Sequence, residues 1–108
     1  MSFMLTVEQI RDRTKTVTRR NGWINLAPGT VINACEKCMG LKKGETVKKI
    51  CKIRVVSVRR EPLDAITQAD VIREGFPEWS PRQFIDLFSK HNGGDSRKEV
   101  TRIEFEYM

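Results

Sequence analysis

The sequence has few cysteines, a single histidine and no long apolar run, and each shortage removes a class of protein. Three cysteines in 108 residues are an odd number, which argues against a framework of disulfide bonds. No apolar run approaches the roughly 18 residues that a membrane-spanning helix needs. The first residues lack the basic segment and long apolar stretch of a signal peptide. We therefore expect a cytoplasmic protein without contact to a membrane.

A structural metal site is also not favoured. Cys35 and Cys38 have the two-residue gap of a zinc knuckle, but only Cys51 and the distant His91 remain to complete a tetrahedral set of ligands. Zinc deaminases need His-x-Glu together with Pro-Cys-x-x-Cys, and the chain has neither motif. The sequence favours buried or free thiols over zinc, and it indicates no metal and no cofactor.

Positive charge is what the chain has in excess. Twenty Lys and Arg residues against 14 Asp and Glu residues give a net charge of +6, and the pI is about 9.6. This balance favours an anionic partner, nucleic acid first, although charge alone identifies no ligand.

The densest basic segment is residues 15–20, Lys-Thr-Val-Thr-Arg-Arg, which contains no carboxylate. If the segment is extended, Thr18 and Arg20 share one face with Thr16, and Lys15 joins them only if the chain turns near Thr16. Arginine suits bidentate phosphate contacts, lysine a point-charge contact, and threonine adds a hydroxyl. The segment indicates either a site for a phosphate or a nucleobase, or a solvated basic edge strand protected from aggregation by its charge.

The remaining pattern predicts an α+β fold. We expect a short strand over 3–5, a helix ending near Arg13 with Thr6 and Gln9 as its capping box, and a buried strand over 30–35. Apolar parity in the long β-run 47–59 changes at Val55–Val56, which predicts a one-residue bulge unless both faces of the strand are partly buried. Helices are expected over 67–75 and from Ser80 onward, and a closing strand over 101–107. About five or six strands with two or three short helices favour a small mixed β-barrel over an open sheet.

With these motifs in order, the chain resembles the ASCH domain family, which has a PUA-like β-barrel. Residues 15–20 match the family signature Lys-Thr-x-Thr-x-Arg, and Trp23, Leu26 and Pro28-Gly29 match the turn that follows it. Val55–Leu63, Glu74-Gly75-Phe76 and Val100–Phe105 match the later strand, helix exit and closing strand. The resemblance covers nearly all of residues 1–108 as one domain, and it looks most like compact members found in phage and prophage genomes.

The resemblance implies a cleft that holds the signature lysine and a downstream acidic residue. PUA-like domains commonly bind RNA, so the expected partner is RNA, a nucleotide or a modified nucleoside. The candidate binding residues are the signature and the basic or aromatic side chains near it: Lys15, Thr16, Thr18, Arg19, Arg20, Trp23, Lys42 and Lys43. Arg19 stands where one branch of the ASCH family, which hydrolyses an amide bond, has an apolar residue. The segment 35–45 is long and lysine-rich. Both features favour a larger, polyanionic ligand.

Hydrolysis is the alternative function. One ASCH branch removes the acetyl group from N4-acetylcytidine with a Lys, a Thr and a Glu, which correspond here to Lys15, Thr18 and Glu74; another member is reported to cleave RNA without a metal. Lys15 acts as a base only if its pKa is depressed, by desolvation or by nearby arginines. Glu74 would protonate the leaving amine, and Arg20 would pair with Glu74 or hold a phosphate.

Plainer interpretations stay open at this point. Lys15 and Glu74 can be ordinary surface residues, and Trp23 fits a core position better than a base-stacking one. Trp79, directly before Ser80, is expected to act as a hydrophobic staple, and Phe76 to pack rather than stack. A third function is that of an accessory protein that binds a host protein. The sequence does not define an oligomeric state.

Overall fold

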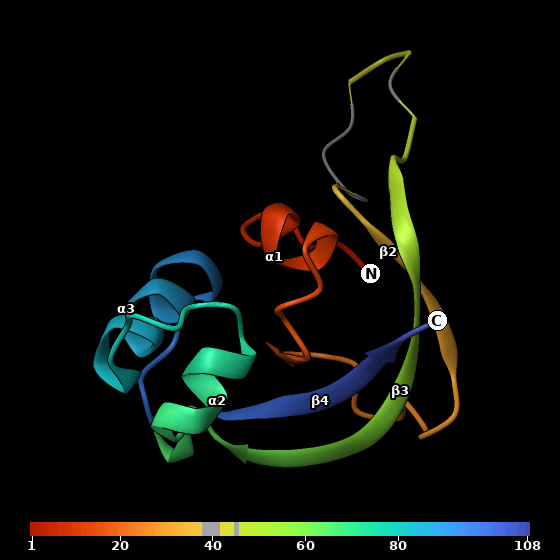
Figure 1. Ribbon diagram of the computed structural model, residues 1–108. Helices are drawn as coiled ribbons and strands as arrows, with labels where there is room; N and C mark the ends of the chain where they lie inside the picture. The colour runs from red at the N-terminus through yellow and green to blue at the C-terminus, as the bar shows by residue number, and fades with distance from the viewer. Residues whose placement is uncertain (38–41, 45) are drawn as a thin grey trace.

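The computed structural model describes residues 1–37, 42–44 and 46–108. Over these residues the chain forms one curled antiparallel sheet with the strand order β1-β4-β3-β2 (Figure 1). The strands are β1 (Val17–Arg20), β2 (Val31–Cys35), β3 (Lys49–Pro62) and β4 (Glu99–Tyr107). The helices are α1 (Val7–Arg11), α2 (Gln68–Arg73) and α3 (Pro81–Asn92). The predicted α+β class is confirmed.

The sheet is a half-barrel, so the expected closed barrel of five or six strands is wrong for the described residues. β1 and β2 remain as two separate edges of the four-stranded sheet. Residues 3–5 form no strand, because the chain makes only an isolated bridge between Ser2 and Cys35 and then turns into α1. α1 lies inside the curve of the sheet (Figure 1), where it covers apolar surface that further strands would cover in a closed barrel.

β3 is a long, curved strand (Figure 1) that contains the predicted bulge. The pairing of β3 with β4 shifts register between Val55 and Ser57, so Val56 is the extra residue. Val55 stays buried while Val56 is 44% exposed. The long strand can therefore pair with β2 at its start and with β4 along most of its length while it turns around one core.

Two clusters of buried side chains divide the interior. One joins α1 to the concave face of the sheet and contains Phe3, Ile10, Ala34, Ile53 and Phe105. The other packs α2 and α3 against the start of β4 and contains Leu63, Ile66, Val71, Phe84, Ile85, Phe88 and Val100. The interior is thus covered by α1 on one side and by the α2–α3 pair on the other.

The cap of α3 agrees with the sequence, and the cap of α1 does not. Ser80 accepts the Gln83 N–H at 3.3 Å, and Gln83 accepts the Ser80 N–H at 2.8 Å, which completes the capping box. Trp79 packs against the second cluster, as a staple should. Thr6 makes no side-chain cap, its N–H donates to the Phe3 carbonyl, and Gln9 donates to the Gly75 carbonyl at 3.3 Å. The residue expected to cap α1 therefore ties α1 to the exit of α2.

Among the residues that the structure describes, no helix combines the length and the apolar character needed to cross a membrane.

Candidate functional site

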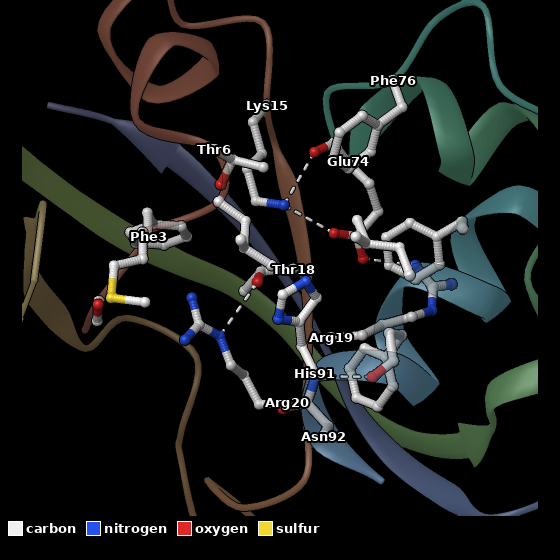
Figure 2. A pocket seen from close by; sticks show the side chains of 16 residues that line it. Phe3, Thr6, Lys15, Thr18, Arg19, Arg20, Glu74, Phe76, His91 and Asn92 are labelled. Carbon is white, nitrogen blue, oxygen red and sulfur yellow. Dashed lines mark hydrogen bonds and ion pairs between the residues drawn. The ribbon is translucent and has the colours of Figure 1, made fainter. Parts of the chain in front are cut away.

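A cavity of about 340 Å³ opens between the first residues of the chain, β1, the exit of α2 and the C-terminal half of α3. Lys15, Thr18, Arg20 and Glu74 supply its polar groups (Figure 2). Its other walls are largely aromatic or come from the end of α3: Phe3, Phe76, Phe84, Phe88, His91 and Asn92. The cavity therefore combines cations, a hydroxyl and a carboxylate with apolar rings.

A tight turn after α1 brings Lys15 into this cavity. Arg13 has a left-handed backbone with φ of 65°, and the Lys15 N–H donates to the Gln9 carbonyl at 3.2 Å. The Thr16 N–H then donates to the Arg73 carbonyl at 2.8 Å, which fixes the start of β1 against α2. The chain thus turns just before Thr16, and Lys15 faces the same cavity as Thr18 and Arg20, as the site hypothesis requires.

Gly75 lets Glu74 approach Lys15 from the opposite side of the cavity. It follows α2 with φ of 103°, and a Cβ at this position would lie 2.7 Å from Gln9 Cγ. A side chain here would push α1 away from the exit of α2, since this conformation and this spacing both favour glycine. The close approach places the Glu74 side chain opposite Lys15.

Lys15 and Glu74 form a buried ion pair. Lys15 Nζ donates to Glu74 Oε1 at 2.7 Å and to the Glu74 carbonyl at 2.9 Å, and the Glu74 side chain is only 2% exposed. Burial lowers the pKa of Lys15; the charge and hydrogen bond of Glu74 oppose this shift, and the charges of Arg20 and Arg19 add to it. The amine is thus easier to deprotonate than an ordinary lysine, as a basic role would require.

Thr18 and Arg20 share a face of β1, as strand periodicity predicts. Arg20 Nε donates to Thr18 Oγ1 at 3.2 Å. The Arg20 guanidinium also lies over the Phe3 ring, 4.8 Å from its centroid. Arg20 is therefore held at the wall of the cavity with its charge close to the threonine hydroxyl.

Arg19 alternates to the opposite face of β1; it is still one of the residues that line the cavity, but its side chain is completely buried. Its guanidinium donates to Glu74 Oε2 at 3.0 Å, to Asp70 Oδ2 at 2.5 Å and to Glu61 Oε2 at 3.3 Å. These three carboxylates compensate the charge of Arg19, so its expected contact with a polyanion stays a prediction without geometric support. It is Arg19, rather than Arg20 as suggested above, that is seen to pair with Glu74.

Asp70 is the centre of the network behind the cavity. Arg102 donates to both of its oxygens, at 2.7 and 3.0 Å, and Arg73 and Arg19 donate as well. Burial alone would raise the pKa of Asp70, but hydrogen bonds from Arg102 and Arg19, with the charge of Arg19, hold that pKa well below its usual range. The carboxylate therefore favours the folded state only while it is ionised.

Acid is expected to lower the free energy of unfolding, because it protonates Asp70. Its pKa in the folded protein lies below the value of about 3.9 in an unfolded chain, so its stabilising contribution is complete above that value and is lost as the pH falls further. Urea unfolding of the wild type should give a smaller free energy at pH 3 than at pH 5. The Asp70→Asn variant, although less stable at pH 5, should show a shallower decrease over the same range. An equally steep decrease in both proteins would assign the acid sensitivity to other carboxylates.

The other predicted contact residues lie away from the cavity. Thr16 uses its backbone to join α2 and β4, through Arg73 and Phe105. Trp23 is 45% exposed, so the core interpretation is wrong, yet it does not line the cavity. Lys42 and Lys43 are exposed residues of the connection between β2 and β3, and they do not line it either. These four positions remain candidates only for contacts outside the cavity.

Of the three cysteines, Cys35 is buried, Cys51 is half-buried and Cys38 lies outside the described residues. Burial raises the pKa of the Cys51 thiol, an effect that the charge of Arg13 opposes. Within the described ranges, no group of three or more His, Cys, Asp or Glu side chains is arranged to hold a metal ion.

His91 and Asn92 were missed by the sequence interpretation, although a signal for His91 exists. Phe84, Leu87 and Phe88 recur at helical spacing, and His91 continues this series at i+7. All four residues line the cavity. The apolar stripe of α3 was interpreted as core alone, but its last turn is part of the site.

Comparison with known proteins gives a fold but no function. No family model matches the chain, and no curated protein is similar to it in sequence. Among solved structures, the crystal structure of protein EF3133 from Enterococcus faecalis V583, with the family model DUF984, is similar with a TM-score of 0.63. The match covers 94% of this chain and 68% of that chain at 13% sequence identity. At this identity the similarity shows a shared small α+β fold alone.

Proposed function

We propose that this chain is a nucleic-acid-binding domain of the ASCH type, with RNA as its expected partner, and that the cavity accepts a single base or nucleoside. The observation that carries this proposal is the meeting of Lys15, Thr18, Arg20 and Glu74 in one aromatic-walled cavity. Its volume of about 340 Å³ lies at the small end of ligand pockets, which suits one base better than a stretch of strand.

The polar groups match the hydrogen-bonding edge of a base. A carboxylate accepts from an exocyclic amine such as that of cytosine, and an ammonium or guanidinium donates to ring carbonyl oxygens. Glu74 and Lys15 bond to each other at 2.7 Å, but each carboxylate oxygen has a second lone pair and the ammonium a third N–H, so both can make one further bond to a base. The rings of Phe76, Phe84 and Phe88 supply apolar surface against which a flat base can lie. Arg20 adds a cation for a sugar-linked phosphate.

Binding of single-stranded RNA should weaken steeply with salt, because each phosphate contact releases counterions. Arg20→Gln is expected to reduce affinity roughly 10- to 100-fold, since a hydrogen bond to a charged group contributes about 1.5–3 kcal/mol. The matched control is Arg54→Gln, which removes an exposed arginine paired with Glu106 outside the cavity. Fluorescence titration at several salt concentrations measures both effects. Flat or absent binding by the wild type would reject the RNA-binding proposal and favour a protein partner.

Metal-independent amide hydrolysis on an N4-acetylcytidine-type nucleoside is the second candidate. It is favoured by one observation, the buried pairing of Lys15 with Glu74 beside the Thr18 hydroxyl. Such a trio can supply a nucleophile, a base and a path for the proton. Cleavage of an RNA phosphodiester bond by the same groups is a further version of this candidate.

Thr18 would be the nucleophile of this amide hydrolysis. The neutral Lys15 amine takes the proton of Thr18 as Thr18 Oγ1 attacks the carbon of the acetyl carbonyl. Arg20 Nε stabilises the negative charge that develops on Thr18 Oγ1. The C–N bond then breaks, and the proton passes from Lys15 through Glu74 to the leaving nitrogen. Water hydrolyses the resulting threonine ester, which releases acetate and returns a proton to Thr18.

A further inference from the structure

We propose that a second concave site, lined by Arg11, Arg13 and Lys49, binds a phosphoryl group, with the backbone of a bound nucleic acid as its expected source. This inference rests on the proposed RNA-binding function and extends it to a surface outside the Lys15–Glu74 cavity. The second site has a volume of about 290 Å³, and its remaining lining residues are Ile10, Ile50 and Cys51.

The lining of this second site is cationic without a carboxylate. Arg11 is largely compensated, because it pairs with Glu8 at 3.4 Å and also with Glu36. Among residues 1–37, 42–44 and 46–108, by contrast, no carboxylate lies within ion-pair distance of Arg13 or Lys49, and both are exposed. These two side chains therefore supply the positive charge that an anion would meet.

Arg13 is held in place before any ligand arrives. Its backbone is left-handed, which is unusual for a long side chain, and the turn is fixed by Asp12, whose Oδ1 accepts from the Thr14 N–H at 3.0 Å and the Thr14 hydroxyl at 2.6 Å. The guanidinium lies over the Tyr107 ring, 5.6 Å from its centroid. Stacking occupies the face of a guanidinium and leaves its edge of N–H groups for a bidentate contact to phosphate.

Tyr107 connects this site to the Lys15–Glu74 cavity. Its hydroxyl donates to the Lys15 carbonyl at 2.6 Å, so the ring under Arg13 is anchored to the residue whose amine enters the cavity. The turn 12–15 thus presents Arg13 to one site and Lys15 to the other. An RNA strand with a base against Lys15 would have the fixed cation of Arg13 on the other side of the same turn.

The test compares two double variants that each remove two positive charges. Arg13→Gln/Lys49→Gln alters the proposed site, whereas Arg82→Gln/Arg97→Gln removes two exposed arginines elsewhere. Affinity for a single-stranded RNA oligonucleotide is measured at several salt concentrations, and cytidine binding is measured in parallel. The site variant should lose about 0.7 from the slope of log affinity against log salt per lost phosphate contact, with unchanged cytidine binding. The control variant should retain the wild-type slope.

Equal slopes of log affinity against log salt in the two double variants would overturn the proposal of a second site. If RNA and cytidine binding are intact in that case, the proposed RNA-binding function is retained. If the wild type binds no RNA, the proposed function fails, and amide NMR with tripolyphosphate decides the site alone. Shifts near Arg13 and Lys49 that vanish in the site variant would then identify a free polyphosphate as the source of the phosphoryl group. No shifts would overturn the site.

Discussion

Replacement of Arg19 by methionine is expected to lower the free energy of unfolding by about 3–5 kcal/mol, because it breaks a buried ionic network by removing one partner. Arg19 is the cation that Glu61, Asp70 and Glu74 share, and its side chain has no exposed surface. Methionine fills similar space but leaves the three carboxylates with less compensation. Arg102 still neutralises Asp70, Lys15 still neutralises Glu74 and Arg59 still pairs with Glu61, so each carboxylate keeps one cation but loses the one that joins the three.

Urea unfolding at neutral pH measures this loss. Arg82→Met is the matched control, because Arg82 is an exposed arginine whose replacement should change the free energy of unfolding by no more than about 0.5 kcal/mol. An Arg19→Met protein that keeps its stability but loses RNA affinity would restore the interpretation of Arg19 as a ligand contact. A loss of both would agree with the geometry, since Arg19 also holds Glu74 Oε2.

Local chemistry made parts of this fold predictable. The Ser80–Gln83 capping box, the bulge beside Val55 and the alternation of β4 each depend on residues that are close in sequence. Barrel closure depends instead on which distant edges meet, and the sequence carries no local signal for that. The misassigned cap of α1 has the same origin, because Gln9 is used by Gly75, 66 residues away.

In the candidate site, too, features that depend on neighbouring residues were predictable, and pairings between distant residues were not. Strand period two correctly places Thr18 with Arg20, and with the same pattern it puts buried Val17 and Arg19 on the other face. The charge of Arg19 led instead to a surface assignment, because a buried arginine is rare unless it is paired, and its partners lie 42 to 55 residues away. The pairing of Lys15 with Glu74 spans 59 residues, and only the family resemblance indicated it.

The two faces of β1 have different tasks in this arrangement. Arg19, on the face opposite to Thr18 and Arg20, holds one oxygen of Glu74, and Lys15 from the preceding turn holds the other. The carboxylate is therefore fixed in position from both sides, which favours recognition of a base by a rigid acceptor. The same fixation suits a proton relay only if Lys15 can give up its proton, so Lys15 distinguishes the binding function from the hydrolytic one.

Lys15→Met is expected to reduce acetate release from N4-acetylcytidine by about 10²- to 10⁴-fold if the hydrolytic candidate holds, the range typical of a positioned acid or base. The reaction needs the neutral amine, and burial lowers the pKa of Lys15. The wild-type rate should therefore rise with pH and level off below the value of about 10.4 for a free lysine. Lys52→Met, an exposed lysine on β3, is the control and should retain the full rate and the same profile.

The same pair of proteins separates binding from catalysis. A wild type that binds cytidine but releases no acetate at any pH would reject the amidohydrolase and leave the binding domain or phosphodiester cleavage. In that case Lys15→Met should still weaken cytidine binding, because it removes a donor 2.7 Å from Glu74 and leaves that carboxylate to Arg19 alone. Unchanged cytidine affinity would show that the base does not contact this pair, and the cavity would lose its assigned ligand.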